Sequence, residues 1–201
     1  GRGVPFDFDE GEKKNGVVKS LGTFMSGGKF ENNSGSAGLN GIGTTATNAI
    51  SDRFDVTVWR GGKQYVQCFH HGRPGHFAGD DFDAKADFKR VDGERLKPGK
   101  PRDGAPAHGT SVRLVLDRTV AADAQFDINN VLFRAHCSAR LISGVTLVVK
   151  NDGWTEEVNP VLVGTATGDY GPAALLEFIS NYHNLPARNH VLSVEGDALF
   201  I

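Results

Sequence analysis

A glycine-rich stretch near the start of the chain has the residue types best suited to holding an anion. It runs from Gly27-Gly28-Lys29 to Gly38-Leu39-Asn40-Gly41-Ile42-Gly43 and leads into a helical pattern. Such a loop presents free backbone N–H groups to phosphate, and Lys29 adds a positive charge. It is neither a dinucleotide-binding nor a Walker A pattern, because no strand precedes it and Lys29 lies far from the helix. Taken alone, it also fits a flexible connection without a ligand.

Two further groups of residues have metal-binding types but unsuitable spacing. The first comprises Cys68, His70, His71 and His76. The second comprises Asp80, Asp81, Asp83 and Asp87. The first group fits no common zinc spacing and is interpreted as polar residues at the end of a hairpin. The second lacks the glycine and glutamate of an EF-hand loop and is interpreted as a solvated charge run. The sequence therefore predicts no metal ligand in this chain.

Composition limits the class of protein. The chain has 201 residues, 39% of them hydrophobic, with 13 Phe and a formal charge of −2. This is enough apolar material for one domain and the start of a second, and the charge argues against binding nucleic acid through bulk charge. Two Cys, no long apolar run and no recognisable signal peptide favour a reduced, cytoplasmic protein without a membrane span.

Hydrophobic periodicity predicts helices alternating with strands. Helices are expected over residues 16–26, 41–51, 127–142 and 173–182. Strands are expected over residues 54–60, 63–70, 110–117, 145–150, 154–163 and 191–194. Gly61-Gly62 is typical of a hairpin turn, and the polar segment 79–108 is predicted to be an exposed insertion.

Several motifs in order along the chain resemble the nucleotide site of the GHKL (Bergerat-fold) ATPases, and specifically the B subunit of type IIA DNA topoisomerases. They are GRGVP at 1–5, GGKF at 27–30, GLNGIG at 38–43, HGTSVR at 108–113 and LISGV at 141–145. Residues 170–186 resemble the opening helix of the family's transducer domain. The resemblance implies an α/β two-layer sandwich with a mixed, largely antiparallel sheet and helices on one face. It implies an ATP-binding domain over 1–165, containing the 79–108 insertion, and the beginning of a transducer domain over 166–201.

The resemblance also implies a set of ATP-contacting residues. They are Arg2, Gly3 and Pro5, flanking adenine and ribose; Gly27, Gly28 and Lys29, at the lid hinge and phosphates; Leu39, Asn40, Gly41, Ile42 and Gly43, around the triphosphate; and Thr110, near the adenine. Residues 30–38 would be a lid that closes over the nucleotide.

The match to the family is incomplete, because several residues that the family uses have no counterpart in this chain and one is replaced. The family's adenine-reading Asp, catalytic Glu and Mg²⁺-binding Asn all correspond to positions before Gly1, and its transducer Lys to one after Ile201. Asn40 stands where bacterial enzymes usually have His. We therefore expect no catalytic residue in this chain, and we expect the isolated chain to be inactive in hydrolysis.

The function implied is the ATP-binding part of a topoisomerase B subunit. ATP and Mg²⁺ would be the cofactors, and ATP binding would close the lid and a dimer gate to drive DNA strand passage. A second B subunit, an A subunit or fused cleavage region, and DNA would be the partners. A non-catalytic or regulatory GHKL nucleotide-binding module is the alternative. Another GHKL ATPase, such as a mismatch-repair protein, chaperone or sensor kinase, is less favoured by GGKF and by the helix expected over 173–182.

Overall fold

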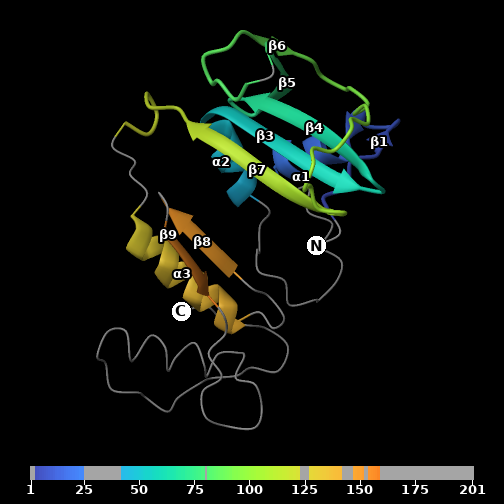
Figure 1. Ribbon diagram of the computed structural model, residues 1–201. Coiled ribbons are helices and arrows are strands. Elements are labelled where there is room, and N and C mark those ends of the chain that lie inside the picture. The colour runs from blue at the N-terminus through green and yellow to red at the C-terminus, as the bar shows by residue number, and fades with distance from the viewer. Residues whose placement is uncertain are drawn as a thin grey trace, which may run out of the picture. The chain divides into compact units, whose positions relative to one another are not determined.

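The computed structural model describes residues 3–24, 42–79, 81–122, 127–141, 147–151 and 154–158 (Figure 1). The chain divides into two compact units, Gly1–Ala124 and Gln125–Ile201. Within the described part, no helix has both the length and the apolar character needed to cross a membrane.

The first unit is built on a five-stranded antiparallel sheet with the order β6-β5-β4-β3-β7 (Figure 1). Its strands are β3 (Ser51–Arg60), β4 (Lys63–His70), β5 (Arg73–Phe77), β6 (Phe88–Arg90) and β7 (Gly109–Leu116). The predicted hairpin is confirmed: Arg60 pairs with Lys63 across Gly61-Gly62. The strand predicted to begin at residue 54 begins at Ser51, directly after a helix. Every pair of neighbours is antiparallel, as the largely antiparallel prediction required.

Two short helices, α1 (Gly16–Gly22) and α2 (Gly43–Ala49), lie on one face of this sheet (Figure 1). Both were predicted, with longer bounds. The core joins α1 to β3 and β4 through six buried side chains: Val17, Val18, Phe54, Val56, Val58 and Phe69. The Phe54 and Phe69 rings meet edge-on with centroids 6.1 Å apart. This burial supplies most of the driving force for the two-layer arrangement.

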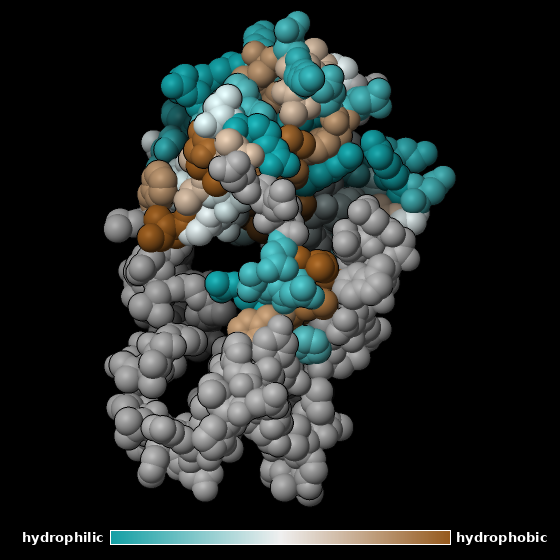
Figure 2. All heavy atoms as spheres, turned by 90° about the vertical axis from the view of Figure 1, so that its left-hand side faces the viewer, coloured by the Kyte–Doolittle hydropathy of each residue, from teal (hydrophilic) through white to brown (hydrophobic). Residues whose placement is uncertain are grey.

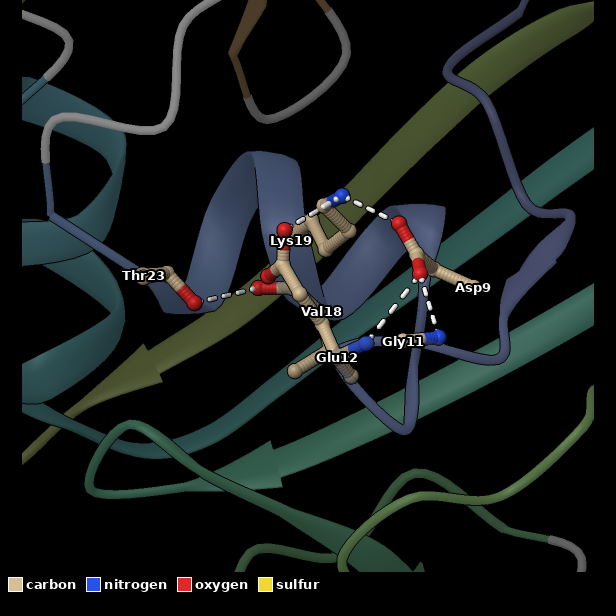
Figure 3. Close-up of polar contacts among 6 residues, drawn as sticks. All are labelled: Asp9, Gly11, Glu12, Val18, Lys19 and Thr23. Atoms are coloured by element: carbon tan, nitrogen blue, oxygen red, sulfur yellow. Dashed lines mark hydrogen bonds and ion pairs between the residues drawn. The ribbon is translucent and has the colours of Figure 1, made fainter.

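A small turn before α1 was not assigned from the sequence. Strands β1 (Phe8–Asp9) and β2 (Lys14–Asn15) form a two-stranded ladder there. The Asp9 carboxylate accepts hydrogen bonds from the Gly11 N–H at 2.9 Å and the Glu12 N–H at 3.1 Å, and lies 2.7 Å from Lys19 Nζ (Figure 3). Asp followed two residues later by Gly is a known turn former, so the signal was present in the sequence.

Asp9 makes the stability of this turn depend on pH. The hydrogen bond from Lys19, with those from Glu12 and Gly11, lowers the pKa of Asp9 from 3.8 to about 2. The stabilisation is therefore complete above about pH 4, and it is lost as the pH falls through about 2, because the folded form must then accept the proton. We expect Asp9→Asn to lose stability relative to wild type at pH 6 and far less at pH 2, measured by urea unfolding. The exposed Asp7, changed to Asn, is the control. An equal difference between wild type and Asp9→Asn at both pH values would contradict this account.

The segment 79–108 is attached to the sheet as well as exposed. It contributes β6, and a bridge joins Gln64 to Gly99. Its anchor is Arg53, which is 6% exposed and ion-pairs with Asp55 at 2.8 Å. The same guanidinium donates to the carbonyls of Asp81 at 3.1 Å and Asp83 at 2.9 Å. Periodicity could not predict this, because the partners are backbone carbonyls some thirty residues away.

Hydrophobic side chains on the outside of the first unit are dispersed. They include Val66 on β4, and Val112 and Val115 on β7. Figure 2 shows hydrophobic patches interleaved with hydrophilic side chains on the face that it presents.

The second unit contains α3 (Ile128–Leu141) and a hairpin of β8 (Leu147–Asn151) and β9 (Trp154–Val158). The helix predicted over 127–142 and the strand predicted over 145–150 are both confirmed within a few residues. Both strands contact α3. The helix predicted over 173–182, the strand over 191–194 and the whole of 166–201 lie outside the described residues.

Candidate functional site

The structure describes five of the predicted ATP-contacting residues: Gly3, Pro5, Ile42, Gly43 and Thr110. The others lie outside the described residues: Arg2, Gly27, Gly28, Lys29, Leu39, Asn40 and Gly41. The described ones fall into two groups, one beside β7 and one at the start of α2.

The first group joins two motifs that are far apart in the sequence. The Val4 N–H donates a hydrogen bond of 2.9 Å to Thr110 Oγ1, across 106 positions of chain. Gly3 has a φ of +84°, and a Cβ there would lie 3.0 Å from the Gly109 carbonyl oxygen and 3.1 Å from Val58 Cγ1. Only glycine suits both the positive φ and the close approach. The segment from Gly3 is therefore held tightly against the start of β7.

Thr110 keeps hydrogen-bonding capacity for a ligand. Its side chain is exposed, and its hydroxyl oxygen acts as acceptor to Val4. A hydroxyl that accepts one bond still has its own proton to donate. The arrangement presents an O–H donor at the edge of a sheet beside a rigid backbone segment, which suits recognition of a heterocyclic base through a direct or water-mediated bond.

The same segment is also held from the side of α1. A Cβ on Gly16 would lie 2.5 Å from the Pro5 carbonyl oxygen, so Pro5 passes directly over the start of the helix. The Gly16 N–H donates to the Asp7 carbonyl at 2.9 Å. Asn15 caps α1 by accepting from the Val18 N–H at 3.0 Å. Position 16 therefore sets the path of the segment that reaches Thr110.

The second group, Ile42 and Gly43, lies at the start of α2. Ile42 is the N-cap of α2 and is 41% exposed, and a Cβ on Gly43 would meet nothing within 4 Å. The first intrahelical bond runs from the Ala46 N–H to the Ile42 carbonyl at 2.8 Å. The amides before Ala46 thus have no acceptor within the helix.

Hydrogen bonds join α2 to the end of α1 and the residue after it, on either side of the segment 25–41 in the chain. Asn48 Nδ2 donates to the Leu21 carbonyl at 3.1 Å, and Thr45 Oγ1 donates to the Thr23 carbonyl at 3.4 Å. The Asn48 side chain is buried, and its Oδ1 has no hydrogen-bond partner within the described part of the chain. Sequence reasoning placed neither residue in the site. The sequence did carry a signal for Asn48, because its amide lies on the inner side of a predicted helix, where a polar group needs a hydrogen-bond partner.

Two cavities among the described residues contain none of the predicted site residues in their lining. One, of about 440 Å³, lies beside α1 and includes Lys13, Thr23 and Arg90. The other, of about 390 Å³, includes Val66, His76 and Leu96. Most of the predicted phosphate-side residues belong to the segment 25–41, which lies outside the described residues.

Cys68 on β4 is not an activated thiol. Burial raises the pKa of the Cys68 thiol to about 12, with the neighbouring Asp55 charge acting in the same direction. Cys68 is therefore protonated at neutral pH and unsuited to act as a nucleophile.

Comparison with known proteins agrees with the motifs. No family model matches the chain. It is 44% identical over 201 residues to the topoisomerase subunit TopoN of Mycolicibacterium smegmatis, covering 98% of this chain and 29% of that protein. It is 30% identical over 164 residues to the DNA gyrase B protein of Caulobacter vibrioides, covering 79% of this chain and 19% of that protein. The chain thus spans less than a third of the length of these relatives.

A solved structure shows the same fold. The 43K ATPase domain of Thermus thermophilus gyrase B, solved in complex with an aminocoumarin, matches 79% of this chain and 35% of its own with a TM-score of 0.53 at 23% identity. The colinear motifs, the relatives and the fold agree. The chain therefore belongs to the GHKL ATPase domains of type IIA DNA topoisomerase B subunits, and it corresponds to part of such a subunit.

Proposed function

We propose that this chain binds ATP, with the base beside Thr110 and Gly3 and the phosphates beside Lys29 and the loop 39–43. The observation that carries the proposal is the hydrogen bond from the Val4 N–H to Thr110 Oγ1, because it joins the family's two base-side motifs in one place. The hydrogen bonds that join α2 to the end of α1 and the residue after it give additional support, since they let the segment 25–41 leave and return at neighbouring points as a lid must.

The test is calorimetric titration of the chain with a non-hydrolysable ATP analogue, with and without Mg²⁺. We expect saturable binding, and we expect Lys29→Ala to weaken it because the charge that faces the phosphates is removed. Lys19 in α1 is bonded to Asp9 and Glu12, so Lys14→Ala is the better control for charge alone. No binding at millimolar analogue, or equal binding by Lys29→Ala, would contradict the proposed phosphate site.

A second prediction separates ligand binding from folding. Gly43→Ala places its Cβ in open space and within a helix, so we expect it to stabilise the protein by up to about 1 kcal/mol. If the phosphates lie against this backbone, the same methyl group obstructs them, and analogue affinity falls about tenfold or more. Thermal unfolding and calorimetry of the same sample measure the two effects. Gly99→Ala, whose Cβ would make only ordinary contact at 3.6 Å, is the matched control.

Hydrolysis requires a general base and ligands for Mg²⁺. We infer that the residues with these roles, the family's Glu and Asn, are not among those of this chain. The residues of this chain would hold and orient ATP. Hydrolysis of that ATP would supply energy to the whole enzyme. We infer that the isolated chain does not hydrolyse ATP, and that the base acts from residues outside this chain.

The wider role follows from the family. We infer that ATP binding closes a lid and a homodimer gate between two B subunits, and that with the A subunit or fused cleavage region this drives passage of DNA in the cytoplasm. We also infer that the ATP-binding domain extends to about residue 165, and that a transducer domain begins over 166–201. Sedimentation of the full-length protein with and without the analogue tests the gate, since dimers should form only when it is bound.

A further inference from the structure

A cluster of two histidines and an aspartate lies at the end of the β4 strand, outside the proposed ATP site. Asp52, His70 and His71 each offer one ligand atom, and these three atoms lie within 4.8 Å of one another. The cluster forms because β3 and β4 pair antiparallel, which sets Asp52 beside the turn that follows His70. The His71 N–H donates to the Ser51 carbonyl at 2.9 Å, which closes that turn against β3.

A hydrogen bond orients the His70 ring, and two carboxylates face the His71 ring. Nδ1 of His70 lies 2.5 Å from the Asp52 carbonyl oxygen. A carbonyl can only accept, so Nδ1 carries the proton and Nε2 has the free lone pair. His71 has Nδ1 facing Asp117 Oδ2 at 3.8 Å and Nε2 facing Asp52 Oδ1 at 3.5 Å. A carbonyl or carboxylate behind the distal nitrogen is the usual support of a metal-ligating histidine.

The spacing of two of the three ligand atoms also suits a metal ion. With Zn–N and Zn–O distances near 2.0–2.1 Å, two ligands of a tetrahedral ion are about 3.3 Å apart. The His71 Nε2 to Asp52 Oδ1 distance of 3.5 Å is close to that value. The side chains of Asp52 and His71 are 34% and 37% exposed, so an ion can reach them from solvent.

From this geometry we infer that Asp52, His70 and His71 form a binding site for one transition-metal dication of the zinc type. Two imidazoles and one carboxylate favour zinc, cobalt or nickel over Mg²⁺, which prefers oxygen ligands alone. Water completes the coordination. The ion joins the beginning of β3 to the turn after β4, and it stabilises that corner of the sheet.

The cluster of Asp52, His70 and His71 differs from the group of Cys and His residues that lie close together in the sequence. The spacing of Cys68, His70, His71 and His76 argued against a metal site, and the structure brings only the two central members into this cluster. His76 is on β5, where it bonds to Glu94. Asp52 joins through strand pairing, eighteen residues before His70.

The test uses the full 201-residue chain after removal of metal with a chelator. Zn²⁺ is titrated by calorimetry and Co²⁺ by visible absorption, with Mg²⁺ as a negative arm. We expect one Zn²⁺ per chain, an intense tetrahedral Co²⁺ spectrum and no Mg²⁺ binding. Asp52→Asn and His71→Gln should weaken Zn²⁺ binding at least tenfold, whereas His76→Gln should not.

Two further measurements keep the test decisive. Zn²⁺ should raise the midpoint of thermal unfolding of wild type and of His76→Gln by several degrees, and leave His71→Gln unchanged. If a variant fails to fold, nitrogen NMR of the wild-type histidine rings replaces it, and only His70 and His71 should shift with Zn²⁺. Absence of saturable binding, or shifts at His76 instead, would overturn the site and leave the cluster as an ion pair.

Discussion

Phe69→Ala is expected to lower the free energy of unfolding by about 3–5 kcal/mol, the largest effect of a single substitution in the first unit. The Phe69 side chain is fully buried between α1 and the sheet, edge-on to Phe54. It also fills the space over Gly22, where a Cβ would come within 2.9 Å of its ring. Truncation leaves a cavity that the surrounding antiparallel strands cannot collapse to fill, because their pairing holds them in place. Urea unfolding monitored by circular dichroism measures the change.

Phe24→Ala is the matched control for this prediction. Phe24 is the same residue type in the same unit, but 58% of it is exposed. We expect its replacement to change stability by no more than about 0.5 kcal/mol. Equal losses for the two variants would mean that the core does not lie between α1 and the strands.

Gly16→Ala is expected to impair both folding and nucleotide binding, although residue 16 is not itself proposed to touch ATP. An added Cβ would lie 2.5 Å from the Pro5 carbonyl oxygen and 2.7 Å from the Pro5 carbonyl carbon, which are backbone atoms. The segment must therefore move away, and the hydrogen bond from Val4 to Thr110 is lost with it. We expect stability to fall by about 1–3 kcal/mol, and affinity for the ATP analogue by about tenfold or more.

Two variants separate these effects. Gly99→Ala introduces the same methyl group at ordinary contact distance, and both quantities should stay near wild type. Thr110→Val removes the acceptor while keeping the shape of the side chain, and it should weaken analogue binding with a smaller loss of stability. If Gly16→Ala bound the analogue as wild type does, the path of residues 3–5 would not matter for the ATP site.

Local pattern determined where α1 and the central strands run, but it did not predict β1, β2, β5 or β6. The alternation of Phe54, Val56 and Val58 defined β3, and Gly61-Gly62 placed the hairpin to β4. The apolar spacing of Val17, Val18 and Leu21 predicted α1 within four residues of its end. These features depend on neighbours in the chain, so the sequence carries them directly. The order of motifs from GRGVP to GTSVR was likewise enough to identify the family.

Contacts between distant residues were decided only by the tertiary structure. The anchoring of segment 79–108 by Arg53 and the tie between Asn48 and Leu21 both join polar groups whose partners no periodicity specifies. The same holds for the two binding surfaces. Val4 meets Thr110 because the segment from Gly3 packs where the end of β3 pairs with the start of β7. Asp52 meets His70 and His71 because β3 pairs with β4. Residue types indicated which chemistry was available. Strand register decided which of those residues lie close to one another.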